Sequence, residues 1–124
     1  MQLSALTLIV PDYEAAIAFY CGVMGFTLTE DIDQGDKRWV RVTPQGGGTG
    51  FILAQPGNST QRTAIGNQGA GRVWLFLHTD DFDRDHARLN AAGVEFEEPP
   101  RVEPYGTVAV FRDVFGNRWD LIGA

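Results

Sequence analysis

The chain has 124 residues, of which 44% are hydrophobic and 21% are charged, a balance that is normal for one globular domain with a hydrophobic core. Its formal net charge of −6 argues against a nucleic-acid binder, which needs a basic surface, and no apolar run approaches the roughly 20 residues that span a bilayer. Because the N-terminus resembles no secretory signal and the single cysteine, Cys21, has no partner for an internal disulfide, we expect a reduced protein in the cytoplasm.

The first predicted element is a strand over residues 3–10, which are rich in aliphatic and β-branched side chains. Asp12 is suited to cap a helix after it, because a carboxylate can accept hydrogen bonds from the exposed backbone N–H groups of the first turn. The helix is predicted from one apolar face at helical spacing, formed by Ala16, Phe19, Tyr20 and Val23. Two strands follow, at residues 38–43 and 50–54, with a turn between them.

Residues 55–71 contain many glycine, asparagine, serine, threonine and glutamine residues and few large apolar ones, which is typical of a linker or loop. The next elements are a strand at 72–79 and a helix at about 82–92. Three further strands are expected near residues 94–97, 107–112 and 118–122. Pro99 and Pro100 break regular structure between the first two of these strands.

The order of these features repeats along the chain. Residues 6–14 can be aligned with residues 75–83, since in both an apolar strand is followed by an acidic residue, an aromatic residue and a second acid. In both halves a helical stretch follows and ends at a glycine, Gly25 in the first and Gly93 in the second. Each half then closes with a glycine that leads into a short apolar strand.

This repeat predicts an α+β fold in a single domain, residues 1–124. The domain is expected to consist of two βαβββ half-modules, residues 1–54 and 72–124, joined by the linker 55–71.

Three motifs carry a resemblance to a known family: Ile9-Val10-Pro11-Asp12, then Ala18-Phe19-Tyr20 leading to Gly25-Phe26, and residues 113–121, D-V-F-G-N-R-W-D-L. Together they resemble the glyoxalase/bleomycin-resistance/extradiol-dioxygenase superfamily, also called vicinal oxygen chelate, and the last is similar to its ending D-P-x-G-N-x-x-E-L. The resemblance covers nearly the whole chain and implies curved mixed sheets that form a ligand cleft. It does not imply one activity, because this fold hosts lyases, isomerases, epimerases, ring-cleaving dioxygenases and drug-binding proteins.

In metal-using relatives, four positions in the cleft bind a divalent cation, and the resemblance places them at Ala5, Ile52, Trp74 and Asp120. Alanine and isoleucine cannot coordinate a cation, and the indole of tryptophan only donates a hydrogen bond. Asp120 alone brings a lone pair, whereas a divalent ion needs three or more protein ligands in such a place. We therefore predict no metal-binding residues and no cofactor, a divalent metal being disfavoured.

Strand alternation predicts which side chains face the cleft, since successive side chains point to opposite faces of a sheet. If Trp74 faces the cleft, Phe76 and His78 do so too, and Thr7 and Asp120 take the same side of their own strands. The predicted ligand-binding residues are Thr7, Trp39, Trp74, Phe76, His78, Tyr105 and Asp120. An aromatic floor with a few polar groups is typical of small-molecule sites.

Several of these residues have an equally simple structural explanation. His78 is a candidate for acid–base chemistry, because an imidazole titrates near neutral pH, or it is a structural histidine at a strand end. Asp120 either orients a ligand or forms an ion pair with Arg112 or Arg118. Tyr105 either lines the rim of the cleft or anchors a turn.

The leading functional hypothesis is a metal-independent binder of the bleomycin-resistance type, which sequesters an aromatic or drug-like small molecule. Relatives form dimers, so the resemblance also implies a homodimer. The alternative is an enzyme, a glyoxalase-like lyase or dioxygenase, that uses a divalent metal or employs His78 and Asp120 as catalytic base and acid. An accessory domain that only dimerises is a third hypothesis, and the sequence does not name the ligand.

Overall fold

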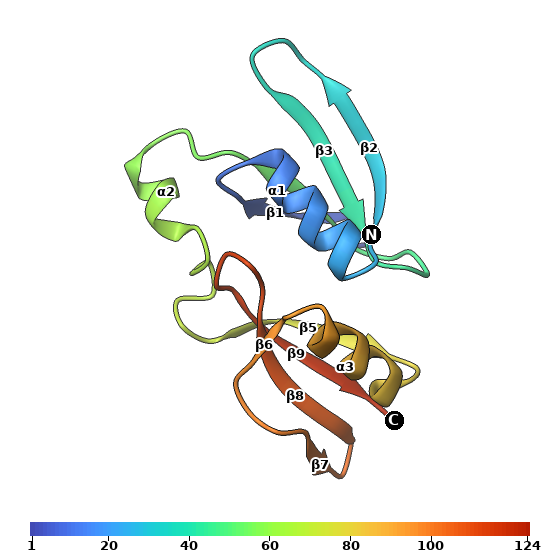
Figure 1. Cartoon of the computed structure of the whole chain (residues 1–124). Coiled ribbons are helices and arrows are strands. Elements are labelled where there is room, and N and C mark those ends of the chain that lie inside the picture. Colours follow the sequence, from blue (N-terminus) through green and yellow to red (C-terminus); the bar gives the residue numbers. More distant parts are fainter. The chain divides into compact units, whose positions relative to one another are not determined.

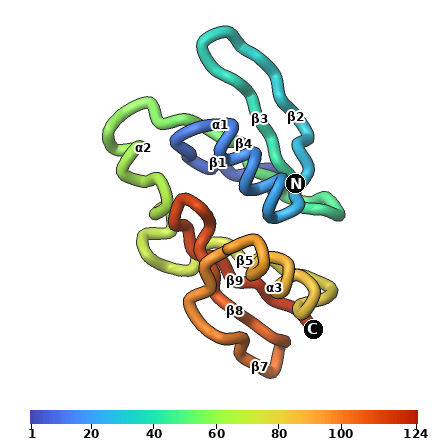
Figure 2. The backbone as a smooth tube through the Cα atoms, viewed as in Figure 1, coloured from blue at the N-terminus to red at the C-terminus, as the bar shows by residue number.

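The computed structural model describes all residues, 1–124, and the chain divides into two compact units, Met1–Ala64 and Ile65–Ala124. Figure 1 shows one sheet with its own helix in each unit, and Figure 2 traces the first unit from blue to green and the second from yellow to red. The division falls inside the segment 55–71 that we expected to be a linker. The assignment of the whole chain to one domain stays a prediction.

The first unit contains a four-stranded mixed sheet in the order β1-β4-β3-β2. Strand β1 runs parallel to β4, while β3 is antiparallel to both β4 and β2. The elements of this unit are β1 (Ala5–Ile9), α1 (Tyr13–Ile17), the π-helix η1 (Ala18–Val23), β2 (Thr27–Asp33), β3 (Arg38–Thr43), β4 (Gly50–Ala54) and α2 (Ser59–Ala64).

The helix of the first unit begins as predicted but widens after one turn. Asp12 is the N-cap, since its carboxylate accepts a hydrogen bond from the Ala15 backbone N–H at 2.9 Å. The helix then continues as a π-helix, and the Met24 N–H bonds to the carbonyl of Phe19, five residues earlier, at 2.9 Å. The wider spacing buries Ala16, Tyr20 and Met24, so the apolar face that we predicted to end at Val23 ends at Met24 instead.

The second unit repeats the strand order of the first. Its sheet has the order β5-β9-β8-β6, with β7 also paired to β8. Its first strand is again parallel to its last, β5 to β9, and the remaining pairs are antiparallel. The elements are β5 (Val73–Thr79), α3 (Phe82–Ala91), β6 (Glu95–Phe96), β7 (Arg101–Glu103), β8 (Gly106–Arg112) and β9 (Arg118–Gly123). The predicted α+β fold with two mixed sheets is confirmed.

One face of each sheet packs against its helix and forms a core of aromatic and aliphatic side chains. In the first unit Tyr20, Phe26 and Phe51 stack in series, with successive ring centroids 6.3 Å apart. In the second unit Phe96, Phe111 and Trp119 form a similar row, with successive ring centroids 5.6 and 5.7 Å apart, and Phe96 also contacts His86 of α3. Full burial of such a ring contributes about 1.5–3 kcal/mol, so these rows fix which face of each sheet points inward.

Three elements were not predicted as such. Strand β2 has the polar sequence T-L-T-E-D-I-D and lies at the edge of its sheet, where most of its side chains are exposed. The loop expected over 55–71 contains the short helix α2, where Asn58 accepts a hydrogen bond from the Gln61 N–H at 2.8 Å. Strand β7 begins directly after the two prolines that we expected to break regular structure. No helix is long and apolar enough to cross a membrane.

Candidate functional site

The face of the second sheet opposite α3 carries three of the seven predicted ligand-binding residues, Phe76, His78 and Asp120. Phe76 is 61% exposed and His78 is exposed, while the intervening Leu75 is buried on the helix side. Phe76 lies beside Asp120 on β9, and His78 lies beside Ile122. We call this side of the sheet the β5–β9 face. Its members on β5 and β9 are Phe76, His78, Asp120 and Ile122, and their neighbours on β8 are Val108 and Val110. Phe76 and His78 are exposed and Asp120 is half-buried, while the three aliphatic side chains are buried.

Trp74 precedes these residues on β5, at an irregular point of the strand. The register between β5 and β9 shifts between Val73 and Leu75, so Trp74 has no partner in the ladder and forms a β-bulge. A Cβ atom added to Gly69 would lie only 2.6 Å from the Cβ atom of Trp74, which means that the loop before β5 packs directly on this side chain. Trp74 is half-buried, and its place on the β5–β9 face stays a prediction.

Asp120 lies between Phe76 on β5 and Val110 on β8, in the middle of the face. Its Oδ1 atom is buried and has no hydrogen-bond partner. Burial raises the pKa of the Asp120 carboxyl; Arg101 and Arg118 lower this pKa, and the negative charge of Glu98 raises it further. Asp120 is thus a half-buried carboxylate with one oxygen that no protein donor reaches.

The ion pair that we considered for Asp120 is not formed. Arg118 binds Glu97 at 2.8 Å and Arg112 approaches the same carboxylate at 3.3 Å, which lowers the pKa of Glu97. Arg101 is likewise engaged, by Glu98 at 2.9 Å and by Glu103 at 2.7 Å. No ion pair joins Asp120 to Arg112 or Arg118, although the charge of Arg118 still lowers the pKa of Asp120.

The remaining predicted residues lie elsewhere. Thr7 and Trp39 belong to the first sheet, on the face opposite α1, because their neighbours Leu8 and Val40 are buried beneath that helix. Tyr105, 67% exposed, lies in the turn between β7 and β8, and its side chain interacts with Arg101, which fits the turn-anchoring alternative. That all the predicted residues share one pocket stays a prediction.

A hollow of about 450 Å³ in the first unit was not anticipated from the sequence. It lies beside the β2–β3 hairpin and is lined by Tyr13, Asp31, Asp33, Gly35, Asp36, Lys37 and Arg38. Arg38 binds Glu14 at 2.6 Å and Asp31 at 2.7 Å, and its guanidinium lies 5.2 Å from the centre of the Tyr13 ring. These contacts attach the hairpin to α1, so we interpret the cluster as structural.

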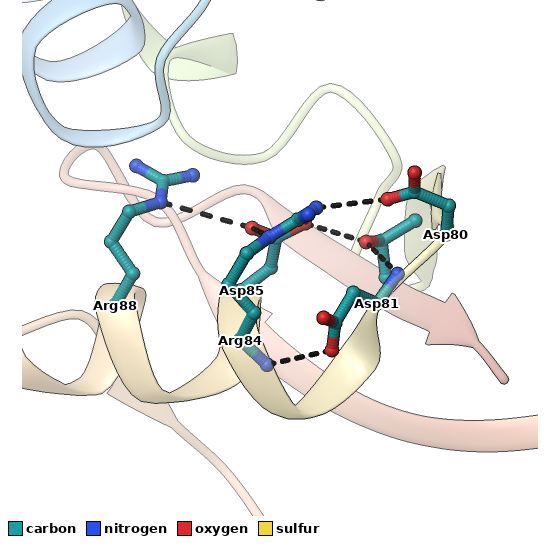
Figure 3. A network of polar contacts seen from close by, with 6 residues as sticks. Asp80, Asp81, Arg84, Asp85 and Arg88 are labelled. Atoms are coloured by element: carbon teal, nitrogen blue, oxygen red, sulfur yellow. Dashed lines mark hydrogen bonds and ion pairs between the residues drawn. The ribbon is translucent and has the colours of Figure 1, made fainter.

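A second polar cluster lies where β5 ends and α3 begins (Figure 3). Arg84 bridges Asp80 at 2.9 Å and Asp85 at 3.1 Å, and Asp81 caps the helix by accepting from the Arg84 N–H at 3.1 Å. Asp85 also accepts a hydrogen bond from Thr79 at 2.5 Å. Every acid in this cluster has a partner, and the cluster fixes the start of α3 next to the strand that carries His78.

The four residues that the family resemblance assigns to a metal site do not fit a divalent cation. Ala5, Ile52 and Trp74 offer no lone pair suited to coordination, which leaves the single carboxylate of Asp120. No group of three or more histidine, cysteine, aspartate or glutamate side chains is arranged to hold a metal ion.

Comparison with known proteins gives consistent results. A family model described as "Glyoxalase/Bleomycin resistance protein/Dioxygenase superfamily" matches residues 2–121. An uncharacterised protein of Shewanella frigidimarina (strain NCIMB 400) is 49% identical over 120 residues, which cover 94% of this chain and 89% of that protein.

Two crystal structures are also similar over nearly their whole length. UcmS2 is 32% identical with a TM-score of 0.84, covering 98% of this chain and 97% of that one. TnmS3, an antibiotic binding protein from Streptomyces sp. CB03234, is 32% identical with a TM-score of 0.81, covering 99% of this chain and 95% of that one.

Proposed function

The chain belongs to the glyoxalase/bleomycin resistance protein/dioxygenase superfamily, and we propose that it is a metal-independent binding protein for an aromatic, drug-like small molecule. The observation that carries the proposal is Phe76, a large aromatic side chain 61% exposed in the middle of a strand, beside the unpartnered carboxylate of Asp120. An apolar surface with a few oriented polar groups is how small-molecule sites are built. The similarity to an antibiotic binding protein supports the same reading.

We further propose that the protein acts in the cytoplasm and as a homodimer, as the family resemblance implies. A binder of this kind needs no chemistry at its site, and it protects the cell by lowering the free concentration of its ligand. The affinity then depends on the area of aromatic surface that the ligand buries and on the polar groups that orient it.

The enzymatic alternative receives less support from the site. A metal-dependent enzyme would need coordinating side chains, and Ala5, Ile52 and Trp74 have none. A metal-free enzyme would use His78 and Asp120 together, yet they lie on different rungs of the ladder, His78 beside Ile122 and Asp120 beside Phe76. We therefore retain binding as the function that the geometry favours.

The proposal is tested by a thermal-shift screen of aromatic small molecules, followed by affinity measurements on the hits. Phe76→Ala and Trp74→Ala should each weaken binding by about tenfold or more, since tenfold corresponds to about 1.4 kcal/mol and burial of a ring contributes at least that. Val114→Ala is the matched control, because Val114 is 60% exposed but lies in the turn after β8. Hits that retain their affinity in both aromatic variants would contradict the proposed site.

A further inference from the structure

The position of Asp120 limits what kind of ligand the β5–β9 face can accept. Its carboxylate is flanked by the exposed ring of Phe76 on one strand and by Val110 on the other. A flat molecule that covers Phe76 therefore also covers Asp120 and removes more water from a carboxylate that is already partly desolvated. Such a ligand binds well only if it supplies a hydrogen-bond donor or a positive charge at that point.

No donor of the protein is bonded to the buried Oδ1 atom of Asp120. The nearby guanidinium groups form their ion pairs with other acids, Arg101 with Glu98 and Glu103, and Arg118 with Glu97. Their charges still act on Asp120 and lower its pKa. The open acceptor next to an exposed aromatic ring is therefore available to a donor from outside the chain.

The charge of the protein bears on the ligand as well. Around the face, four carboxylates, those of Glu97, Glu98, Glu103 and Asp120, are balanced by four guanidinium groups, those of Arg72, Arg101, Arg112 and Arg118. The formal net charge of the chain is −6, so the protein as a whole attracts cationic ligands more than anionic ones.

We infer that the ligand class is a planar aromatic molecule with a cationic or N–H-donating group, which Asp120 binds while Phe76 and Trp74 hold the ring system. This inference rests on the proposed function and adds the chemistry of the ligand. A charge-assisted hydrogen bond to a desolvated carboxylate is about twice as strong as a neutral one, so Asp120 acts as a specificity-determining residue.

The test compares two probes of nearly equal shape, 9-aminoacridine, a cation at pH 7.5, and acridine, which is neutral there. Affinities are measured by fluorescence titration with the full-length protein. The wild type should bind the cation about tenfold or more tightly than the neutral probe. Asp120→Asn should reduce this preference to about twofold or less while changing the affinity for acridine little. Asp83→Asn, an exposed acid on α3 and thus on the other side of the sheet, should retain the full preference.

The outcomes separate the inference from the proposed function. If the wild type binds both probes equally, or if Asp120→Asn keeps the preference, the ligand class is wrong and the aromatic site stands. If neither probe binds while other aromatic molecules do, the ligand class is again wrong. If no aromatic molecule binds in either experiment, both proposals fail.

A stability measurement on the same variant gives an independent readout. A half-buried carboxylate with one unpaired oxygen does not stabilise the fold, so Asp120→Asn should leave the urea midpoint of the ligand-free protein unchanged or raise it. A clear drop in the midpoint would show that Asp120 has a structural partner, and would overturn the inference.

Discussion

At the scale of single residues, the buried carboxylate of Asp113 organises the turn between β8 and β9. Its Oδ1 atom accepts from the backbone N–H groups of Phe115, Gly116 and Asn117 at 2.9–3.0 Å. Its Oδ2 atom accepts from the Asn117 amide and the Trp119 indole, both at 3.0 Å. Asp113 is 4% exposed, and its bonds to the Asn117 N–H, the Asn117 amide and the Trp119 indole are buried, so these three donors have no access to water.

We predict that Asp113→Asn destabilises the protein by about 2–4 kcal/mol. Asparagine replaces one accepting oxygen with an NH2 group, which faces N–H donors and leaves buried N–H groups without an acceptor. Urea denaturation at pH 7 measures the change. Asp36→Asn, in the exposed β2–β3 turn, is the control and should change stability by less than about 0.5 kcal/mol. A loss below about 1 kcal/mol for Asp113→Asn would contradict this account of the turn.

Asp85 gives a prediction about pH. The hydrogen bond from Arg84 lowers the pKa of this carboxyl most, and the hydrogen bond from Thr79 lowers it further. A carboxyl whose pKa is lowered in the folded state stabilises the protein above its unfolded pKa, and this contribution is lost as the pH falls through the folded value.

The difference in unfolding free energy between wild type and Asp85→Asn should therefore be about 1 kcal/mol at pH 7 and should shrink below about pH 4. Urea titrations at a series of pH values measure it, and Asp36→Asn should show no such trend. A difference that grows as the pH falls would mean that the network in Figure 3 does not hold Asp85 in its charged form.

At the scale of elements, the loop before β5 is built on close backbone contact. Gly66 has φ +72°, and a Cβ atom added to it would lie 1.8 Å from the carbonyl oxygen of Phe115. Gly71, five positions later, has a similar φ of +87° but open space around it. Alanine substitutions at Gly66 and Gly71 therefore distinguish the free-energy cost of a left-handed backbone from the additional cost of a steric clash.

We expect Gly71→Ala to cost about 1 kcal/mol and Gly66→Ala about 3 kcal/mol or more, measured by urea denaturation. The first value reflects only backbone strain, whereas the second adds displacement of the loop from the β8–β9 turn. Because Gly69 in the same loop contacts Trp74, Gly66→Ala should also shift the tryptophan emission. Equal costs for the two variants would show that the loop adjusts freely.

The elements that sequence reasoning predicted well are those in which the hydrophobic period is strong. Strands β3 and β4 have the predicted bounds, because their alternating apolar side chains are buried. Strand β2 gave no such signal, since an edge strand is held by backbone pairing to β3 and needs little apolar burial. Helix α2 was missed for the same reason: it has no buried residue, and its start depends on the Asn58 cap.

The site was predictable to the extent that strand alternation determines it. Alternation correctly placed Phe76 and His78 on one face and Leu75 on the other. It could not show the bulge at Trp74, which depends on the register between β5 and β9. It also could not show that Arg112 and Arg118 prefer Glu97 to Asp120, because that choice depends on side-chain distances across three strands.

At the scale of the whole molecule, the two units use one topology for different purposes. Both sheets pair their first strand with their last, and both have an aspartate cap, Asp12 or Asp81, where the first strand leads into the helix. The second unit alone combines an exposed strand aromatic, Phe76, with an unpartnered carboxylate, Asp120. Both units thus share one backbone topology, and a few side chains on the sheet of the second unit provide the proposed binding chemistry.

The last prediction concerns metals and the whole protein. Of the family's metal positions, only Asp120 offers a coordinating atom, and one carboxylate holds a divalent ion weakly. A site with a dissociation constant of about 1 µM would add about 2.7 kcal/mol of stability at 100 µM metal, which raises the melting temperature of a domain of this size by roughly 10 °C.

We therefore expect that 100 µM zinc, nickel or manganese, and equally a chelator, shifts the melting temperature by less than about 1 °C. Elemental analysis of the purified protein should find well below one equivalent of divalent metal. The decisive control is Asp120→Ala, since any genuine site at the family position must include this side chain. Near one equivalent of metal in the wild type, lost in Asp120→Ala together with a large shift in melting temperature, would contradict a metal-independent binder and restore the enzymatic alternative.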